Sequence, residues 1–169
     1  MIKNLFAALS LALLACAPAL AQDKADKGRT VPHVTVQDMA GKSADFSSFV
    51  NTEGPTVISF WATWCKPCIQ ELTAFEDHYT DLVKEKKLRL LAVSVDDARS
   101  QGRVGPFVAS RGWAYQVLLD PNQDLKRAMS VVNVPHTFLL DKEGRIVWQH
   151  NSYNPGDEDE LAEQVRKLN

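Results

Sequence analysis

The stretch "SFWATWCKPCIQEL", residues 59–72, places Cys65 and Cys68 two residues apart. An apolar run without alternation, residues 55–62, leads into the pair and predicts a strand buried on both faces. From Cys65 to about residue 87, apolar residues recur at three- and four-residue steps, which predicts a helix. Cysteines this close are typical of a redox pair or of half a metal site, and the rest of the chain must decide between the two.

The pair stands where a strand ends and a helix begins. With Cys65 as the N-cap, its sulfur faces free backbone N–H groups and the positive end of the helix dipole. Both favour the thiolate, as does the positive charge of Lys66. Cys68 then takes the third helical position, within disulfide reach but screened by the first turn, where Pro67 costs little. We therefore expect Cys65 to be the better-exposed nucleophile.

The whole chain is consistent with one domain. It has 169 residues, 45% of them hydrophobic, and a formal net charge of −2. One hydrophobic core is the default at this length, and nothing indicates a basic surface for nucleic acid. The patterns predict, in order, a hairpin, a strand, a helix, a strand, a helix, a strand, a helix, two strands and a helix. This alternation predicts an α/β sandwich with a mainly parallel centre and an antiparallel edge.

The chain opens with "MIKNLFAALSLALLACAPALAQ", which has a basic start, a short apolar run and an Ala-x-Ala signal. We interpret residues 1–21 as a secretory signal peptide, because the run is too short for a membrane span of about 20 residues. An alternative is lipidation at Cys16, since "LLAC" resembles a bacterial lipobox. Residues 22–30 are polar and predict a flexible linker before a domain at 31–169. The protein is thus expected to be periplasmic or otherwise exported.

Once Cys16 is set aside, the cysteine count favours a functional role for the remaining pair. An exported protein normally uses disulfides to stabilise its fold or has no cysteines at all. The Cys65–Cys68 bridge would close only a very short loop and would stabilise little.

The segment "FWATWCKPC" resembles the active site of the thioredoxin superfamily. The preceding hairpin, the CxxCxxE arrangement and "VPHTFLLDKEGRIV" resemble its TlpA/ResA-like branch, the exported thiol–disulfide oxidoreductases. The resemblance covers about residues 31–168. It implies a thioredoxin-like three-layer sandwich: a mixed central sheet, helices on both faces and an added N-terminal β-hairpin.

The resemblance also implies roles for the two cysteines. Cys65 would attack a substrate disulfide and form a mixed disulfide, and Cys68 would then release the reduced substrate. This chemistry uses the redox-active disulfide itself and needs no cofactor or metal.

A substrate-binding surface is implied around the pair. Pro135 matches the cis-proline of the family, and a cis bond there can present the backbone of Val134 to an extended substrate segment. Trp64, Lys66 and Pro67 flank the sulfurs and complete the expected surface.

Glu71 stands where the ResA-like branch carries an acidic residue. It shares a helix face with Cys68, three residues earlier, so its carboxylate could take the proton of that thiol. The alternative is that Glu71 only solvates the first turn and favours the helix dipole. Thioredoxins have a buried acid where this chain has Ser59, and its absence favours Glu71 or water as the proton acceptor. They often have a kinking proline where this chain has Thr73, so we expect a straighter active-site helix.

Other functions compete with this interpretation. Structural zinc usually needs four ligands, and the chain has no second cysteine pair. A copper-handling protein of related fold would space its cysteines by three and add a distal histidine, for which His136 is the candidate. A non-catalytic module could hold peptides at the surface around Val134. A peroxidatic cysteine needs a threonine three residues earlier, where this chain has Ala62.

The direction of electron flow is harder to predict from the sequence than the redox chemistry itself. Pro67 resembles reducing members, whereas Lys66 acts the other way, and residues 96–112 are too short for the helical insertion of strongly oxidising relatives. We therefore expect a reductant of disulfides in exported proteins, and we expect it to act as a monomer. Apocytochrome c is one candidate substrate, which would give the protein a role in cytochrome c biogenesis. Because no nucleotide-binding fingerprint is present, family analogy implies a membrane-embedded thiol electron donor.

Overall fold

The computed structural model describes residues 27–168. The predictions of a signal peptide and of lipidation at Cys16 lie outside these residues. Within the described part of the chain, no helix combines the length and the apolar character needed to cross a bilayer.

The centre of the molecule is a seven-stranded sheet of order β2-β1-β5-β4-β3-β6-β7. Strand β3 pairs in parallel with β4, and β4 with β5, whereas the outer pairs are antiparallel. The predicted parallel centre and antiparallel edges are therefore confirmed. The strands are β1 (Thr35–Asp38), β2 (Ser43–Asp45), β3 (Thr56–Trp61), β4 (Arg89–Ser94), β5 (Gln116–Leu119), β6 (His136–Leu140) and β7 (Ile146–Asn151).

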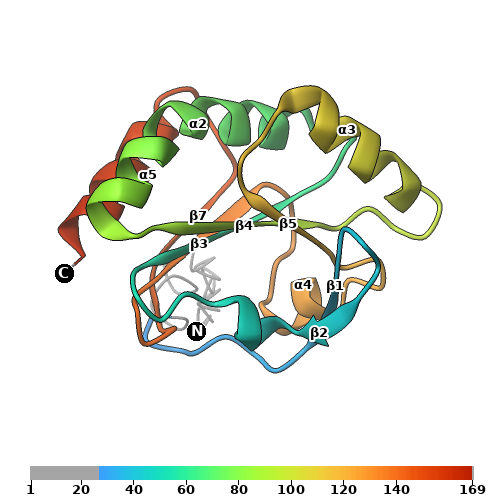
Figure 1. Cartoon of the computed structure of the whole chain (residues 1–169), viewed down its shortest axis with the longest axis horizontal. Helices are drawn as coiled ribbons and strands as arrows, with labels where there is room; N and C mark the ends of the chain where they lie inside the picture. The colour runs from blue at the N-terminus through green and yellow to red at the C-terminus, as the bar shows by residue number, and fades with distance from the viewer. Residues whose placement is uncertain (1–26, 169) are drawn as a thin grey trace, which may run out of the picture.

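Helices cover both faces of this sheet. Figure 1 shows α2, α3 and α5 on one face and α4 on the other. The order of elements agrees with the order predicted from the sequence. The helices are α2 (Lys66–Lys86), α3 (Val104–Arg111), α4 (Asp124–Ala128) and α5 (Asp157–Lys167), with 3₁₀ turns η1 (Phe46–Phe49) and η2 (Gln101–Arg103).

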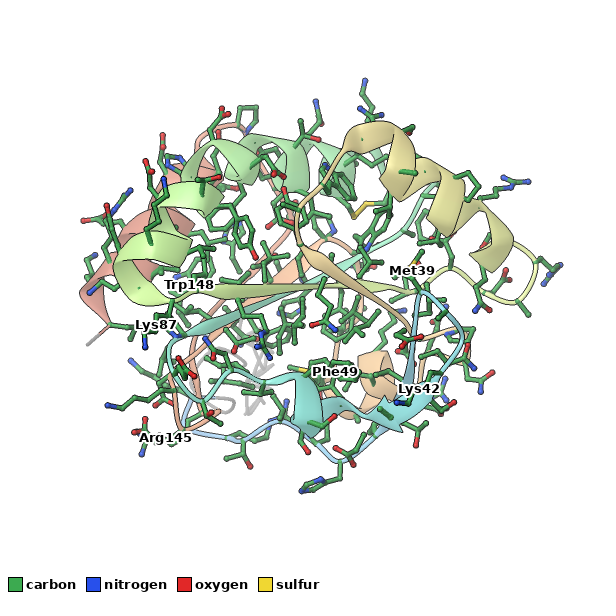
Figure 2. The ribbon with its side chains drawn as sticks, in the orientation of Figure 1. Met39, Lys42, Phe49, Lys87, Arg145 and Trp148 are labelled. Atoms are coloured by element: carbon green, nitrogen blue, oxygen red, sulfur yellow. A yellow bond between two sulfur atoms is a disulfide. The ribbon has the colours of Figure 1, made fainter. Side chains whose placement is uncertain are left out.

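Strand β3 lies at the middle of the core. All six of its residues are buried, as expected for a strand that has neighbours on both sides and helices on both faces. Phe60 meets Phe138 of β6 edge to face, with ring centroids 6.0 Å apart. Figure 2 shows side chains filling the space between the layers, whereas the charged ends of Lys87 and Arg145 lie at the periphery.

The N-terminal hairpin widens the sheet. Strands β1 and β2 pair around a turn at Gly41, whose φ of +80° suits glycine. Strand β1 then continues the sheet beyond β5 and buries Val36. Residues before β1 also contact the domain, since Gly28 donates its N–H to the carbonyl of Ile146 at 2.7 Å. The exact bound between linker and domain stays a prediction.

The topology brings two loops together at one end of the sheet. The CxxC segment follows the last residue of β3. Strand β6 runs antiparallel to β3, and its first residue, His136, pairs with Phe60. Pro135 therefore precedes β6 at the same end at which the chain leaves β3 for Cys65.

Candidate active site

The two cysteines form a disulfide at the start of α2. Their Cα atoms are 5.4 Å apart. Cys65 is the N-cap, and its sulfur accepts the N–H of Cys68 at 3.3 Å. Pro67 lies in the first turn without losing a helical hydrogen bond. Cys65 keeps 5% of its surface exposed and Cys68 none, so the first cysteine is the more accessible of the two.

A buried carboxylate holds the loop that leads to Cys65. Asp96, which is 1% exposed, accepts the N–H of Thr63 at 2.8 Å and its hydroxyl at 2.6 Å. The hydroxyl of Ser94 donates to the same carboxylate at 2.9 Å. Sequence reasoning did not single out Asp96. The sequence feature that could have identified Asp96 is its position just after β4, because the carboxyl ends of neighbouring parallel strands meet at one edge of a sheet.

Glu71 is buried in α2, three residues after Cys68. Its side chain accepts a hydrogen bond from the hydroxyl of Thr137 at 2.7 Å and another from Ser59 at 3.3 Å. Burial raises the pKa of the Glu71 carboxyl to about 7, although both hydrogen bonds act in the opposite direction. With 6% of its surface exposed, Glu71 does not solvate the first turn of α2. Its chemical role is taken up under the proposed function.

Ser59 stands where thioredoxins have a buried acid, and the structure shows what replaces that acid. The Ser59 hydroxyl points to the carboxylate of Glu71, which reaches the same region from the helix. One carboxyl group thus remains near the sulfurs, supplied by α2 instead of β3. The active-site helix itself is continuous from Lys66 to Lys86, past Thr73.

The peptide bond between Val134 and Pro135 is cis, as the resemblance implied. The carbonyl of Pro135 accepts the N–H of Ser152 at 2.9 Å. Within residues 27–168, by contrast, the N–H and carbonyl of Val134 have no hydrogen-bond partner. Val134 therefore offers one unpaired stretch of backbone beside the end of β3.

Exposed apolar side chains flank the disulfide on both loops. Trp64 precedes Cys65 directly and is 65% exposed, as predicted for a surface aromatic. Val132, in the loop before Pro135, is 68% exposed, and sequence reasoning missed it. Both side chains are therefore available for contact with a binding partner.

His136, the candidate distal ligand for copper, packs within the protein instead. Its ring stacks on Phe138 with centroids 4.3 Å apart, and its Nε2 lies 3.1 Å from the side-chain oxygen of Gln149. In the described part of the chain, no group of three or more His, Cys, Asp or Glu side chains is arranged to hold a metal ion.

Comparison with known proteins places this site in a family. The sequence pattern of the AhpC/TSA family matches residues 27–149. The chain belongs to that family. Among curated proteins, the thiol-disulfide oxidoreductase ResA of Bacillus anthracis is 31% identical over 129 residues, which is 76% of this chain and 71% of ResA. The family member described here is accordingly a thiol–disulfide oxidoreductase of the ResA type.

Solved structures agree with this assignment. An uncharacterized thioredoxin-like protein from Porphyromonas gingivalis is 42% identical, with a TM-score of 0.74 over 82% of this chain and 90% of the other. A putative thiol:disulfide interchange protein DsbE from Chlorobium tepidum is 28% identical, with a TM-score of 0.72 over 83% and 96%. The thioredoxin-like fold and the ResA-like resemblance expected from the sequence are confirmed.

Proposed function

We propose that this member of the family is an exported reductase of protein disulfides, with Cys65 as the attacking thiol. The observation that carries the proposal is the placement of the Cys65–Cys68 disulfide at the N-terminus of α2, at the end of the sheet where Pro135 precedes β6. The N-terminal signal pattern supports export, and lipidation at Cys16 remains the alternative form of the mature chain.

The reaction begins with the reduced protein. The Cys65 thiolate attacks one sulfur of the substrate disulfide, so that a mixed disulfide forms and one substrate thiolate leaves. Cys68 then attacks Cys65 in that mixed disulfide, which closes the intramolecular bridge and releases the second substrate thiolate. Two electrons pass from the protein to the substrate, and the two substrate thiolates take up protons.

Glu71 supplies what the second step needs. Cys68 is fully buried, and a thiol in such surroundings attacks only after losing its proton. A carboxylate whose pKa is raised to about 7 is half ionised near neutral pH and can accept that proton. Glu71 and Cys68 are three residues apart on α2 and share one face of the helix.

Substrate binding is assigned to the loops around the pair. An extended segment of substrate can pair with the free N–H and carbonyl of Val134, in the manner of an added strand. Trp64 and Val132 provide apolar contact on either side. Pro135 fixes the loop beside Cys65, and Lys66 and Pro67 border the sulfur on the helix side.

Two observations favour reduction as the direction. The connection from β4 to β5 holds only η2 and the eight-residue α3, without the large helical insertion expected of a strong oxidant. Pro67 between the cysteines resembles reducing members. The electron donor we propose is a membrane-embedded thiol protein, and the substrates are exported proteins with disulfides, apocytochrome c among them. The protein is proposed to act as a monomer.

The deciding experiment is the reduction potential of the Cys65–Cys68 pair, measured by equilibration with glutathione or dithiothreitol. A potential near or below about −200 mV is expected for a reductant. A potential near about −120 mV would instead identify a disulfide donor. The Cys65→Ser variant separates catalysis from binding, because a catalyst loses all activity with this change whereas a peptide-binding module keeps its affinity.

A further inference from the structure

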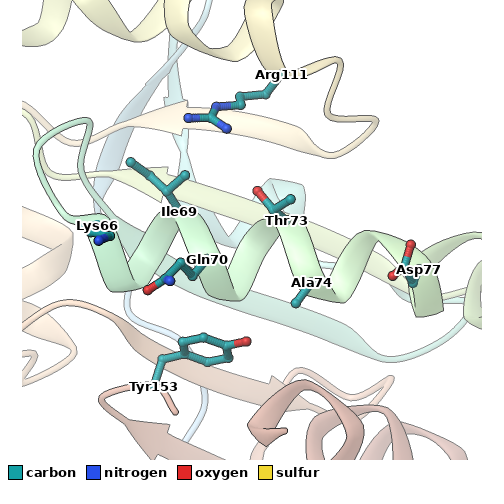
Figure 3. Close-up of a pocket in the computed structure, with 8 residues that line it drawn as sticks. All are labelled: Lys66, Ile69, Gln70, Thr73, Ala74, Asp77, Arg111 and Tyr153. Carbon is teal, nitrogen blue, oxygen red and sulfur yellow. The ribbon is translucent and has the colours of Figure 1, made fainter. Parts of the chain in front are cut away.

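The outward face of α2 forms the floor of an open groove of about 620 Å³. Figure 3 shows this groove along the helix, with Lys66 and Ile69 near its N-terminal end and Asp77 at the other. Arg111, the last residue of α3, and Tyr153, in the connection from β7 to α5, stand on opposite sides of the helix. The volume is within the range of about 300–1,000 Å³ that is usual for ligand pockets.

The groove begins next to the reactive sulfur. Lys66 follows Cys65 directly, and the floor residues recur at three- and four-residue steps, on the side of α2 opposite to its buried face. From Lys66 to Asp77 the helix rises about 16 Å, which is the length of roughly five extended residues. A polypeptide whose cysteine is joined to Cys65 can therefore continue along the groove.

The charges of the groove have no ion-pair partner within the described residues. These charges belong to Lys66, Arg111 and Asp77. The Arg111 guanidinium lies 5.0 Å above the centre of the Phe107 ring, a cation–π contact that fixes its position and leaves its charge available.

The groove also has a rigid apolar part. Ile69 and Ala74 lie on its floor. The ring of Tyr153 forms one side, and its hydroxyl donates to Glu158 at 2.8 Å, which holds it in place. The site thus combines apolar surface with one cation beside Cys65, a second cation on the Arg111 side of the helix, and one anion farther along α2.

We propose that this groove binds the substrate polypeptide beside the attacked cysteine, and that it selects segments in which an acidic residue accompanies an apolar one. The acidic side chain pairs with Arg111 or Lys66, while the apolar side chain covers Ile69, which points to the Arg111 side of the helix. The inference rests on the proposed function, since it names the class of substrate that the reductase prefers. Charge complementarity of this kind sets partner choice and association rate more than total affinity.

The test uses the reduced protein and pairs of short disulfide-bonded peptides. The two peptides of a pair are identical except for one residue, which is glutamate in one and glutamine in the other. Across the pairs, this residue is moved through positions one to six on either side of the cysteine. The rate of peptide reduction in a single turnover is measured for each. At the best position, the glutamate peptide should react about two- to five-fold faster, as expected for one exposed ion pair. The ratio should fall as salt is added.

Variants assign this preference to the groove. Arg111→Gln should bring the glutamate-to-glutamine rate ratio close to one, and Arg111→Glu should invert it. Arg103→Gln is the matched control, because it removes the same charge from an exposed residue of η2 that does not line the groove. This control should keep the wild-type ratio.

Equal rates for all peptides, or a preference that survives in Arg111→Gln, would overturn the inference and leave the proposed function intact. A reduced protein that transfers electrons to none of the peptides would contradict both. The ratio of rates is unaffected by partial loss of folded protein, so a destabilised variant still gives a decisive answer.

Discussion

Replacing Glu71 by glutamine should change how the stability of the protein depends on pH. The folded protein raises the pKa of this carboxyl from 4.5 to about 7, mainly because burial penalises the charged form. A group with a raised folded-state pKa binds its proton more tightly when folded. Its contribution to stability is therefore fully present below pH 4.5 and is lost as pH rises through about 7.

The magnitude follows from the shift. Between pH 5 and pH 8, ionisation of Glu71 should lower the free energy of unfolding of the wild type by about 2–3 kcal/mol relative to a variant that cannot ionise. Glutamine keeps the size of the side chain and an oxygen that accepts from Thr137. The Glu71→Gln variant should therefore gain stability over the wild type as pH rises, by about 5–10 °C in Tm.

Urea denaturation of the oxidised proteins at pH 5, 6, 7 and 8 measures this difference. Glu85→Gln is a suitable control, because Glu85 is exposed on the same helix and, among the described residues, forms an ion pair only with Arg166, at 3.6 Å. If the wild-type and Glu71→Gln curves run parallel across this pH range, the carboxyl does not titrate with a raised pKa and the reasoning about Glu71 as a proton acceptor is wrong.

Three further changes test neighbouring parts of the site. Cys68→Ser should trap the mixed disulfide with substrate, visible as a covalent adduct on a non-reducing gel that dithiothreitol removes. Thr137→Val removes the hydrogen bond that lowers the pKa of Glu71 most, so this pKa should rise further. In the same denaturation series, the stability of the variant should therefore decline at a higher pH than that of the wild type. Asp96→Ala leaves the part-buried N–H and hydroxyl of Thr63 without their acceptor and should lower the free energy of unfolding by about 1–3 kcal/mol, whereas Asp96→Asn should cost less.

The local part of the site could be predicted from the sequence because it spans a single helical turn. Once Cys65 is taken as the N-cap, the spacing of two residues fixes Cys68 at the third helical position, and the structure confirms both. The burial of Glu71 could not be obtained in this way. Its partners Ser59 and Thr137 lie 12 and 66 residues away on two different strands, so their convergence depends on the pairing of β3 with β6.

Asp96 and Val132 show two other limits of predicting the site from the sequence. An acidic residue after a strand is usually part of a turn, and only the parallel pairing of β3 with β4 brings Asp96 under the loop at Thr63. Val132 belongs to an apolar run that resembles core. It becomes exposed because the chain turns sharply after α4, where Ser130 has a φ of +59°.

The hydrogen bond between Gly28 and Ile146 decides where the preceding segment joins the domain. Ile146 pairs with Leu140, and Leu140 pairs with Thr56, the first residue of β3. The five steps of β3 from Thr56 to Trp61 then separate this point from the disulfide end of the sheet by about 17 Å. A molecule tethered through its N-terminal segment would thus carry the Cys65–Cys68 disulfide at the opposite end of the central strand from the point of attachment. The length of that segment would set how far the sulfur can reach without altering its chemistry.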